Sequence, residues 1–290
     1  MYDNDMYEDE TKGTSRRWAV LATGLALGGG LGLIGLAGPA QAAVPGLVQV
    51  QASSPFTSAD KSVTVTCPAG RVVLSPGGYL TGANGAVGMD RIRPNAALTS
   101  VTVRAAETDP FGGAWSVTAV AKCAFAPPGL TRVAVTTLST SADKSVTATC
   151  PAGRFLTGAG GQFTNGGGEV IMAALTPNPA LTAVTVTGDE DAVYPLTWSA
   201  TAYAICANPL PGLVRVAATS PSNSTAAKAA VAFCPAGTVQ VGGGASVGGG
   251  GEVVMDDISP APTTMTVVAD EEDPFAGNWR ATSYAICAFP

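Results

Sequence analysis

Residues 57–71 read TSADKSVTVTCPAGR, and residues 140–154 read TSADKSVTATCPAGR, so the two stretches differ at a single position. In the first stretch Val63, Val65 and Cys67 occupy every second position. This period of two is typical of a β-strand that buries one face. A duplicated strand with its cysteine on the inward side is therefore the starting point for the fold.

The duplication extends through the chain from residue 45 onward. The tripeptide Pro-Gly-Leu begins at Pro45, Pro128 and Pro211, a shift of 83 residues each time. A looser third form of the cysteine strand surrounds Cys234. A repeat of this length is a small domain rather than a solenoid unit. We therefore expect three modules, at residues 43–126, 127–209 and 210–290.

Each copy closes with a strand that begins at a tryptophan and ends at a cysteine. A period of two places both residues on the inward face, with small Ala, Val and Ser residues between them. Turns rich in Gly, Pro and Asn separate four to seven strands per copy. The predicted fold class is all-β, with three tandem disulfide-closed antiparallel β-sandwich modules after an N-terminal signal peptide. The closing pairs are Trp115 and Cys123, Trp198 and Cys206, and Trp279 and Cys287.

The outward positions of this last strand differ between the copies. The second copy has Tyr203 and Ile205 there, and the third copy has equivalent Tyr and Ile residues. The first copy has Val120 and Lys122 instead. Apolar side chains on both faces indicate a strand that is covered twice. We therefore expect the modules to pack together, with the first copy in a less buried position.

Six cysteines form three pairs at similar spacing. In an exported chain, an even count at repeated spacing indicates disulfides. Only pairing within each module gives three equivalent units the same covalent structure. Buried free thiols are an alternative, and zinc is disfavoured because no two cysteines lie close in sequence. The expected disulfides are Cys67–Cys123, Cys150–Cys206 and Cys234–Cys287.

Residues 1–42 have the organisation of an export signal. Basic residues between positions 12 and 17 precede an uncharged run at residues 18–38, and a small-residue A-x-A site ends at Ala42. This order is typical of a secretory signal peptide, with either Sec or twin-arginine export. An uncleaved membrane anchor is the alternative, but the run is rich in glycine. The sequence predicts a secreted or cell-surface protein without membrane association after cleavage.

Composition excludes several classes of function. The chain contains no histidine, which removes Ser-His-Asp and Cys-His nucleophile pairs and His-ligated metal sites. A net charge of −6 leaves no basic stripe for nucleic acid. With 46% hydrophobic residues the chain is too apolar for intrinsic disorder.

The acidic turn before each tryptophan is the first candidate site. Clustered carboxylates bind Ca²⁺, although this spacing matches no EF-hand loop, and a solvated loop is the alternative. Paired carboxylates also suggest a glycosidase, but such enzymes need a deep cleft lined by aromatic residues. No cofactor is expected apart from calcium. The weak calcium candidates are Asp189, Asp191, Asp270 and Asp273, and the residues Glu107, Glu190 and Glu271 share one offset from tryptophan.

Glycine-rich segments at residues 77–88, 158–168 and 242–251 are the second candidate. None has the Gly-Lys-Ser/Thr ending of a P-loop. We expect these glycines to serve hairpins and bulges, and a backbone nest for an anion is the alternative.

The pattern VT-x-TCPAG, a glycine-rich segment and then W-x-x-x-A-Y-A-I-C-A resembles an uncharacterised repeat module of exported actinobacterial proteins. Similar segments occur in phage tail-associated proteins. The resemblance covers residues 45–290 and is best at Thr149–Gly153 and Tyr203–Ala207. It implies an extracytoplasmic β module with a disulfide, and it brings no catalytic residue or cofactor.

We therefore expect a non-enzymatic secreted or cell-surface binding protein whose ligand is a cell-wall glycan or an extracellular protein. Three similar faces would give such binding multivalency. A self-assembling structural or coat protein is the alternative, and a secreted hydrolase is the second alternative. No nucleic-acid partner is expected.

Overall fold

The computed structural model describes residues 44–290, which belong to one compact unit. The predicted signal peptide at residues 1–42 lies outside these residues. The described chain is almost entirely β, with eighteen strands and the short 3-10 helix η1 (Gly250–Glu252). No helix within residues 44–290 has the length and apolar character needed to cross a membrane. The predicted all-β class is confirmed.

The strands fall six to each module in chain order. Module 1 contains β1 (Val48–Ser53), β2 (Lys61–Thr66), β3 (Val72–Thr81), β4 (Val87–Pro94), β5 (Ser100–Glu107) and β6 (Ser116–Ala124). Module 2 contains β7 (Thr131–Thr136), β8 (Lys144–Thr149), β9 (Phe155–Thr164), β10 (Val170–Pro177), β11 (Ala183–Glu190) and β12 (Ser199–Ala207). Module 3 contains β13 (Val214–Thr219), β14 (Ala227–Phe233), β15 (Val239–Val247), β16 (Val253–Pro260), β17 (Thr264–Glu271) and β18 (Ala281–Ala288).

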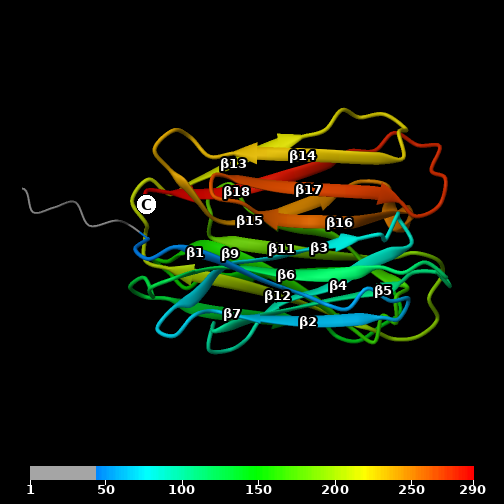
Figure 1. Cartoon of the computed structure of the whole chain (residues 1–290), viewed down its shortest axis with the longest axis horizontal. Helices are drawn as coiled ribbons and strands as arrows, with labels where there is room; N and C mark the ends of the chain where they lie inside the picture. Colours follow the sequence, from blue (N-terminus) through cyan, green and yellow to red (C-terminus); the bar gives the residue numbers. More distant parts are fainter. Residues whose placement is uncertain (1–43) are drawn as a thin grey trace, which may run out of the picture. The chain divides into compact units, whose positions relative to one another are not determined.

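The sheets do not stop at module boundaries. Three antiparallel six-stranded sheets form, each with three strands from one module and three from another. The module 1 strands β1, β6 and β3 continue into β16, β17 and β14 of module 3, so β3 (cyan) lies beside β16 (orange) in Figure 1. The other two sheets have the strand orders β13-β18-β15-β10-β11-β8 and β2-β5-β4-β9-β12-β7. Each module is thus a sandwich of two half-sheets, and the modules pack together as expected.

We name the three module boundaries by the strands that pair across them. The 1–2 junction pairs β4 with β9, the 2–3 junction pairs β10 with β15, and the 3–1 junction pairs β16 with β3. Each pairing spans only two residue pairs, such as Ile92 with Gly161 and Arg91 with Gln162. The strand pairing between modules is therefore short and depends on close backbone approach.

Glycines permit this approach, which corrects the expectation that they serve only hairpins and bulges. An added Cβ at Gly160 of β9 would collide with the carbonyl oxygen of Ile92 in module 1. Gly77 of β3 faces the Ile258 carbonyl, and Gly244 of β15 faces the Leu175 carbonyl in the same way. A mid-strand glycine often marks such close backbone contact. The glycine-rich segments therefore hold the modules against one another.

The three disulfides have the predicted pairing. Each one joins the residue after the second strand of its module to the last strand, which belongs to the other half-sheet. The Cα–Cα distance is 5.7 Å in all three. The predicted inward parity also holds, because Trp115 and Trp198 are fully buried and Trp279 is 2% exposed. Each sandwich therefore closes on a tryptophan-centred core with a covalent link between its layers.

Candidate functional site

The acidic turns supply a partner for each buried tryptophan. The indole Nε1–H of Trp115 donates to Glu107 Oε1 at 3.1 Å, that of Trp198 to Glu190 at 2.6 Å, and that of Trp279 to Glu271 at 2.8 Å. The other carboxylate oxygen accepts the backbone N–H four residues later in each turn. A buried indole N–H needs such an acceptor. The shared offset of these glutamates therefore reflects a repeated structural bond.

A lysine lies over the ring of each tryptophan. Lys61 Nζ lies 3.5 Å from the Trp115 ring centroid, and Lys144 and Lys228 lie 3.7 and 4.2 Å from theirs. Lys61 also donates to the Thr57 and Ala59 carbonyls at 2.7 and 2.5 Å. Burial lowers the pKa of both Lys61 and Lys144. Cation–π contact and carbonyl acceptors thus stabilise an ammonium inside each sandwich.

The sequence contained a signal for these lysines that was missed. Lys61 shares the inward parity of Val63 and Val65, and Lys144 repeats the pattern in module 2. A lysine at an inward strand position needs a partner inside the core. Glu, Trp and Lys together form a structural unit that occurs three times.

The calcium candidates do not form one set. Asp191 shares a hydrogen bond with Glu272 of module 3, which also accepts from Thr108 of module 1 at 2.8 Å. Asp270 pairs instead with Asp256, while Asp273 lies exposed. Among residues 44–290, no three His, Cys, Asp or Glu side chains are placed to hold a metal ion. One carboxyl pair, Asp191 with Glu272, therefore joins the acidic turns of modules 2 and 3, and the other pair lies within module 3.

These pairs hold protons at unusually high pH. Burial and the neighbouring Asp191 and Asp273 carboxylates raise the pKa of Glu272 to about 7. Burial and the Asp270 carboxylate raise the pKa of Asp256 to about 9. In each pair the protonated group donates to the charged one, which removes like-charge repulsion. Each pair is half-buried and is held together by one shared proton.

Two of the three junctions are closed by an arginine and a tyrosine. At the 1–2 junction Arg132 donates to the Pro94 carbonyl at 2.7 Å and covers the Tyr203 ring at 5.0 Å. At the 2–3 junction Arg215 donates to the Pro177 carbonyl at 2.5 Å and lies over the equivalent tyrosine. Beneath them Ile205 and Ile286 are fully buried. Apolar side chains thus fill the interior of both junctions.

The 3–1 junction carries different side chains at four equivalent positions. Lys122 replaces Ile205 and Ile286, and Gln49 replaces the arginine. Gln240 stands where the other junctions have Val73 and Leu156, and Ser75 stands where they have glycine. All three polar residues in the interior, Ser75, Lys122 and Gln240, are at most 2% exposed. One junction in three has therefore exchanged an apolar interior for a polar one.

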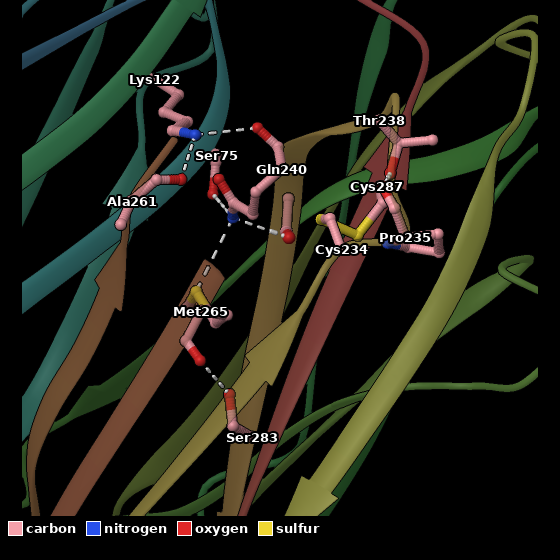
Figure 2. The surroundings of a disulfide bond; sticks show 11 residues. Ser75, Lys122, Cys234, Pro235, Thr238, Gln240, Ala261, Met265, Ser283 and Cys287 are labelled. Atoms are coloured by element: carbon pink, nitrogen blue, oxygen red, sulfur yellow. Dashed lines mark hydrogen bonds between the residues drawn. A yellow bond between two sulfur atoms is a disulfide. The ribbon is translucent and has the colours of Figure 1, made fainter. Parts of the chain in front are cut away.

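This interior forms a hydrogen-bonded network, drawn in Figure 2 beside the Cys234–Cys287 disulfide. Lys122 Nζ donates to the carbonyls of Gln240, at 3.0 Å, and Ala261. The Gln240 amide donates to Ser75 Oγ at 3.1 Å and to the Gly242 carbonyl at 2.8 Å. Burial lowers the pKa of Lys122 to about 8. The prediction that the first copy is less buried at this strand is wrong, because polar partners replace apolar cover around Lys122.

A cavity opens beside this lysine. Its volume is about 470 Å³, within the range of small-molecule sites. Apolar residues form most of its wall, and Lys122 and Gln49 are its polar side chains. Module 1 contributes the wall from Val44 to Gln49, and module 3 contributes Val239, Pro262 and Pro290. Sequence reasoning missed this site because it requires two modules to meet.

Comparisons with known proteins assign no family to the chain. No protein-family model matches it, and a search of curated proteins gives no match.

Proposed function

We propose that this chain is an exported, non-enzymatic binding protein of the cell exterior. Three disulfides belong to an oxidising compartment, and the leader-like residues 1–42 agree with export. The resemblance to exported actinobacterial repeat modules supports the same location. The absence of histidine from the whole sequence removes Ser-His-Asp and Cys-His nucleophile pairs, which agrees with a non-enzymatic role.

The loop tips of module 2 carry the proposal. Leu138, Val193 and Leu196 are 86%, 94% and 61% exposed. The sister modules have Pro55 and Pro221 at the first of these positions, proline at the second and glycine at the third. The fold therefore does not require large aliphatic side chains there. Exposed apolar groups without a folding role favour a contact with another macromolecule.

A protein is the partner that these side chains favour. Branched aliphatic groups bury apolar area against a complementary protein surface. A wall glycan is the second ligand class, because the sheets expose hydroxyl pairs such as Thr64 with Thr102 and Thr147 with Thr185. One experiment distinguishes these two ligand classes.

The test measures retention on cell-envelope material. We expect residues 43–290 to be retained, and the variant Leu138→Pro/Val193→Pro/Leu196→Gly, which carries the sister-module residues, to lose most retention. Protease treatment of the envelope beforehand should abolish retention if the ligand is a protein. Retention that survives protease and is displaced by soluble wall glycan would favour the glycan. Absence of retention would contradict the binding role.

Self-assembly is a second candidate, favoured by one edge strand. β14 lies at the edge of its sheet, and Phe233 at its end is 65% exposed. Modules 1 and 2 have Thr66 and Thr149 at this position. An edge strand presents unpaired backbone groups to a second chain. Light scattering that rises with protein concentration would separate self-assembly from binding to another molecule.

A further inference from the structure

The 3–1 junction has a buried cation that its two sister junctions lack. Lys122 is 2% exposed, while Ile205 and Ile286 occupy the equivalent places. Two of the three junctions therefore form with isoleucine at this position. A buried lysine costs free energy through desolvation unless a partner compensates it. Its presence points to a use other than holding the modules together.

Its partners in the chain do not satisfy it. An ammonium has three N–H donors, and the carbonyls of Gln240 and Ala261 accept two of them. Both acceptors are neutral. Within residues 44–290 the ion pairs involve Arg104 with Asp60 and Asp90, so no carboxylate pairs with Lys122. The cation thus lacks an anionic partner in the described chain.

The cavity lies where such a partner would bind. Lys122 lines it, together with Leu47, Val48, Val239 and Pro262, whose side chains are apolar. At the 2–3 junction the arginine equivalent to Gln49 reaches across to a carbonyl of the neighbouring module. Gln49 makes no such bond and is exposed. The 3–1 junction therefore combines apolar walls with one buried positive charge.

We propose that this cavity binds a small amphipathic carboxylic acid. Its alkyl chain packs against the Val, Leu and Pro walls, and its carboxylate accepts the third N–H of Lys122. Two features of the junction then have a counterpart in the ligand: the apolar wall in the alkyl chain and the unpaired cation in the carboxylate. The 2–3 junction has a cavity of similar volume, about 480 Å³, lined by Arg215, so Lys122 is what distinguishes the 3–1 cavity. This inference goes beyond the proposed function, whose partner contacts the loop tips of module 2.

Titration calorimetry of residues 43–290 with decanoate tests the proposal, with decanol as the uncharged control ligand. We expect decanoate to bind, and decanol to bind at least tenfold more weakly, because a charged hydrogen bond is lost. Lys122→Ile, which copies the sister junctions, should weaken decanoate binding at least tenfold. Gln51→Arg adds a positive charge on the exposed face of β1 and should leave binding unchanged.

Several outcomes would overturn the assignment. Wild-type protein that binds no decanoate, or Lys122→Ile that binds it as tightly as wild type, contradicts it. Near-UV circular dichroism verifies that each variant is folded, and Lys122→Met retains side-chain length if the isoleucine variant fails. The module 2 loop variant should bind decanoate normally, so failure here is distinguishable from failure of the proposed function.

Discussion

Individual side chains show how far alternation along a strand reveals the core. The period of two placed Val63, Val65 and Cys67 inward, and the structure agrees. The same parity applies to Lys61, whose partner is not on this strand. The partner, the Trp115 ring, follows 54 positions later and becomes a neighbour only when the sandwich closes. The parity of a residue can be read from its neighbours in sequence, whereas the partner of a buried charge can be distant in sequence.

The buried Lys122 makes the free energy of unfolding change with pH in the alkaline range. Its pKa is about 8 in the folded protein, below the ordinary value of 10.5. The unfolded chain therefore binds more protons between these values, and stability rises with pH across this window. Below pH 8 the cost of the buried charge is present in full, on the order of 3 kcal/mol. The raised pKa of Asp256, about 9, opposes this rise below pH 9, so the contribution of Lys122 is measured as a difference from a variant, by urea unfolding at pH 7, 8, 9 and 10.

Lys122→Met isolates the contribution of this one group. Lys61 and Lys144, whose pKa values burial also lowers, contribute equally to wild type and variant, and their effect cancels in the difference. We expect the difference in unfolding free energy between the two proteins to shrink as pH rises from 8 to 10.5. A difference that stays constant over this range would show that Lys122 remains charged at no cost.

At the scale of elements, the strands were predictable and their partners across modules were not. The repeated pattern separated strands from turns, and each module has six strands, within the expected four to seven. The pairing of β9 with β4 depends on a backbone approach between residues about seventy positions apart. Glycine permits this approach but is equally suited to turns, which led to the hairpin interpretation. Tyr203 and Ile205 did indicate a second cover for β12, without identifying it.

Gly160→Ala tests the close approach at the 1–2 junction. The new Cβ would collide with the Ile92 carbonyl and lie 2.8 Å from Pro94 Cδ. We expect the unfolding free energy to fall by about 1–3 kcal/mol, since overpacking forces the backbones apart. Gly112→Ala is the control, because a Cβ there meets nothing within 4 Å. Equal stability of the two variants would mean that the strands separate without cost.

For the whole molecule, the repeat indicated three modules but not how deeply they are joined. Three similar copies joined by short, proline-containing connections are compatible with modules that move independently and with modules that pack into one unit. The difference lies in a few positions, such as Gly160 and Gly77, that allow sheets to continue through the boundaries. The special character of the 3–1 junction was visible only as Lys122 in place of isoleucine. The cavity could not be predicted from the sequence, because modules 1 and 3, which are far apart in the chain, both contribute to its walls.

Shared sheets predict that the loss of one disulfide weakens all three modules. Replacing Cys150 and Cys206 with alanine removes the module 2 bridge, which stabilises by about 4 kcal/mol in the chain-entropy model. Modules 1 and 3 keep their own bridges, yet each shares a sheet with module 2. Hydrogen exchange followed by mass spectrometry should therefore show faster exchange in β4 and β15 as well as in module 2. Ser145→Ala, an exposed change on β8, should leave every module protected. Faster exchange confined to module 2 would mean that the junctions transmit no stability and that the three sandwiches unfold separately.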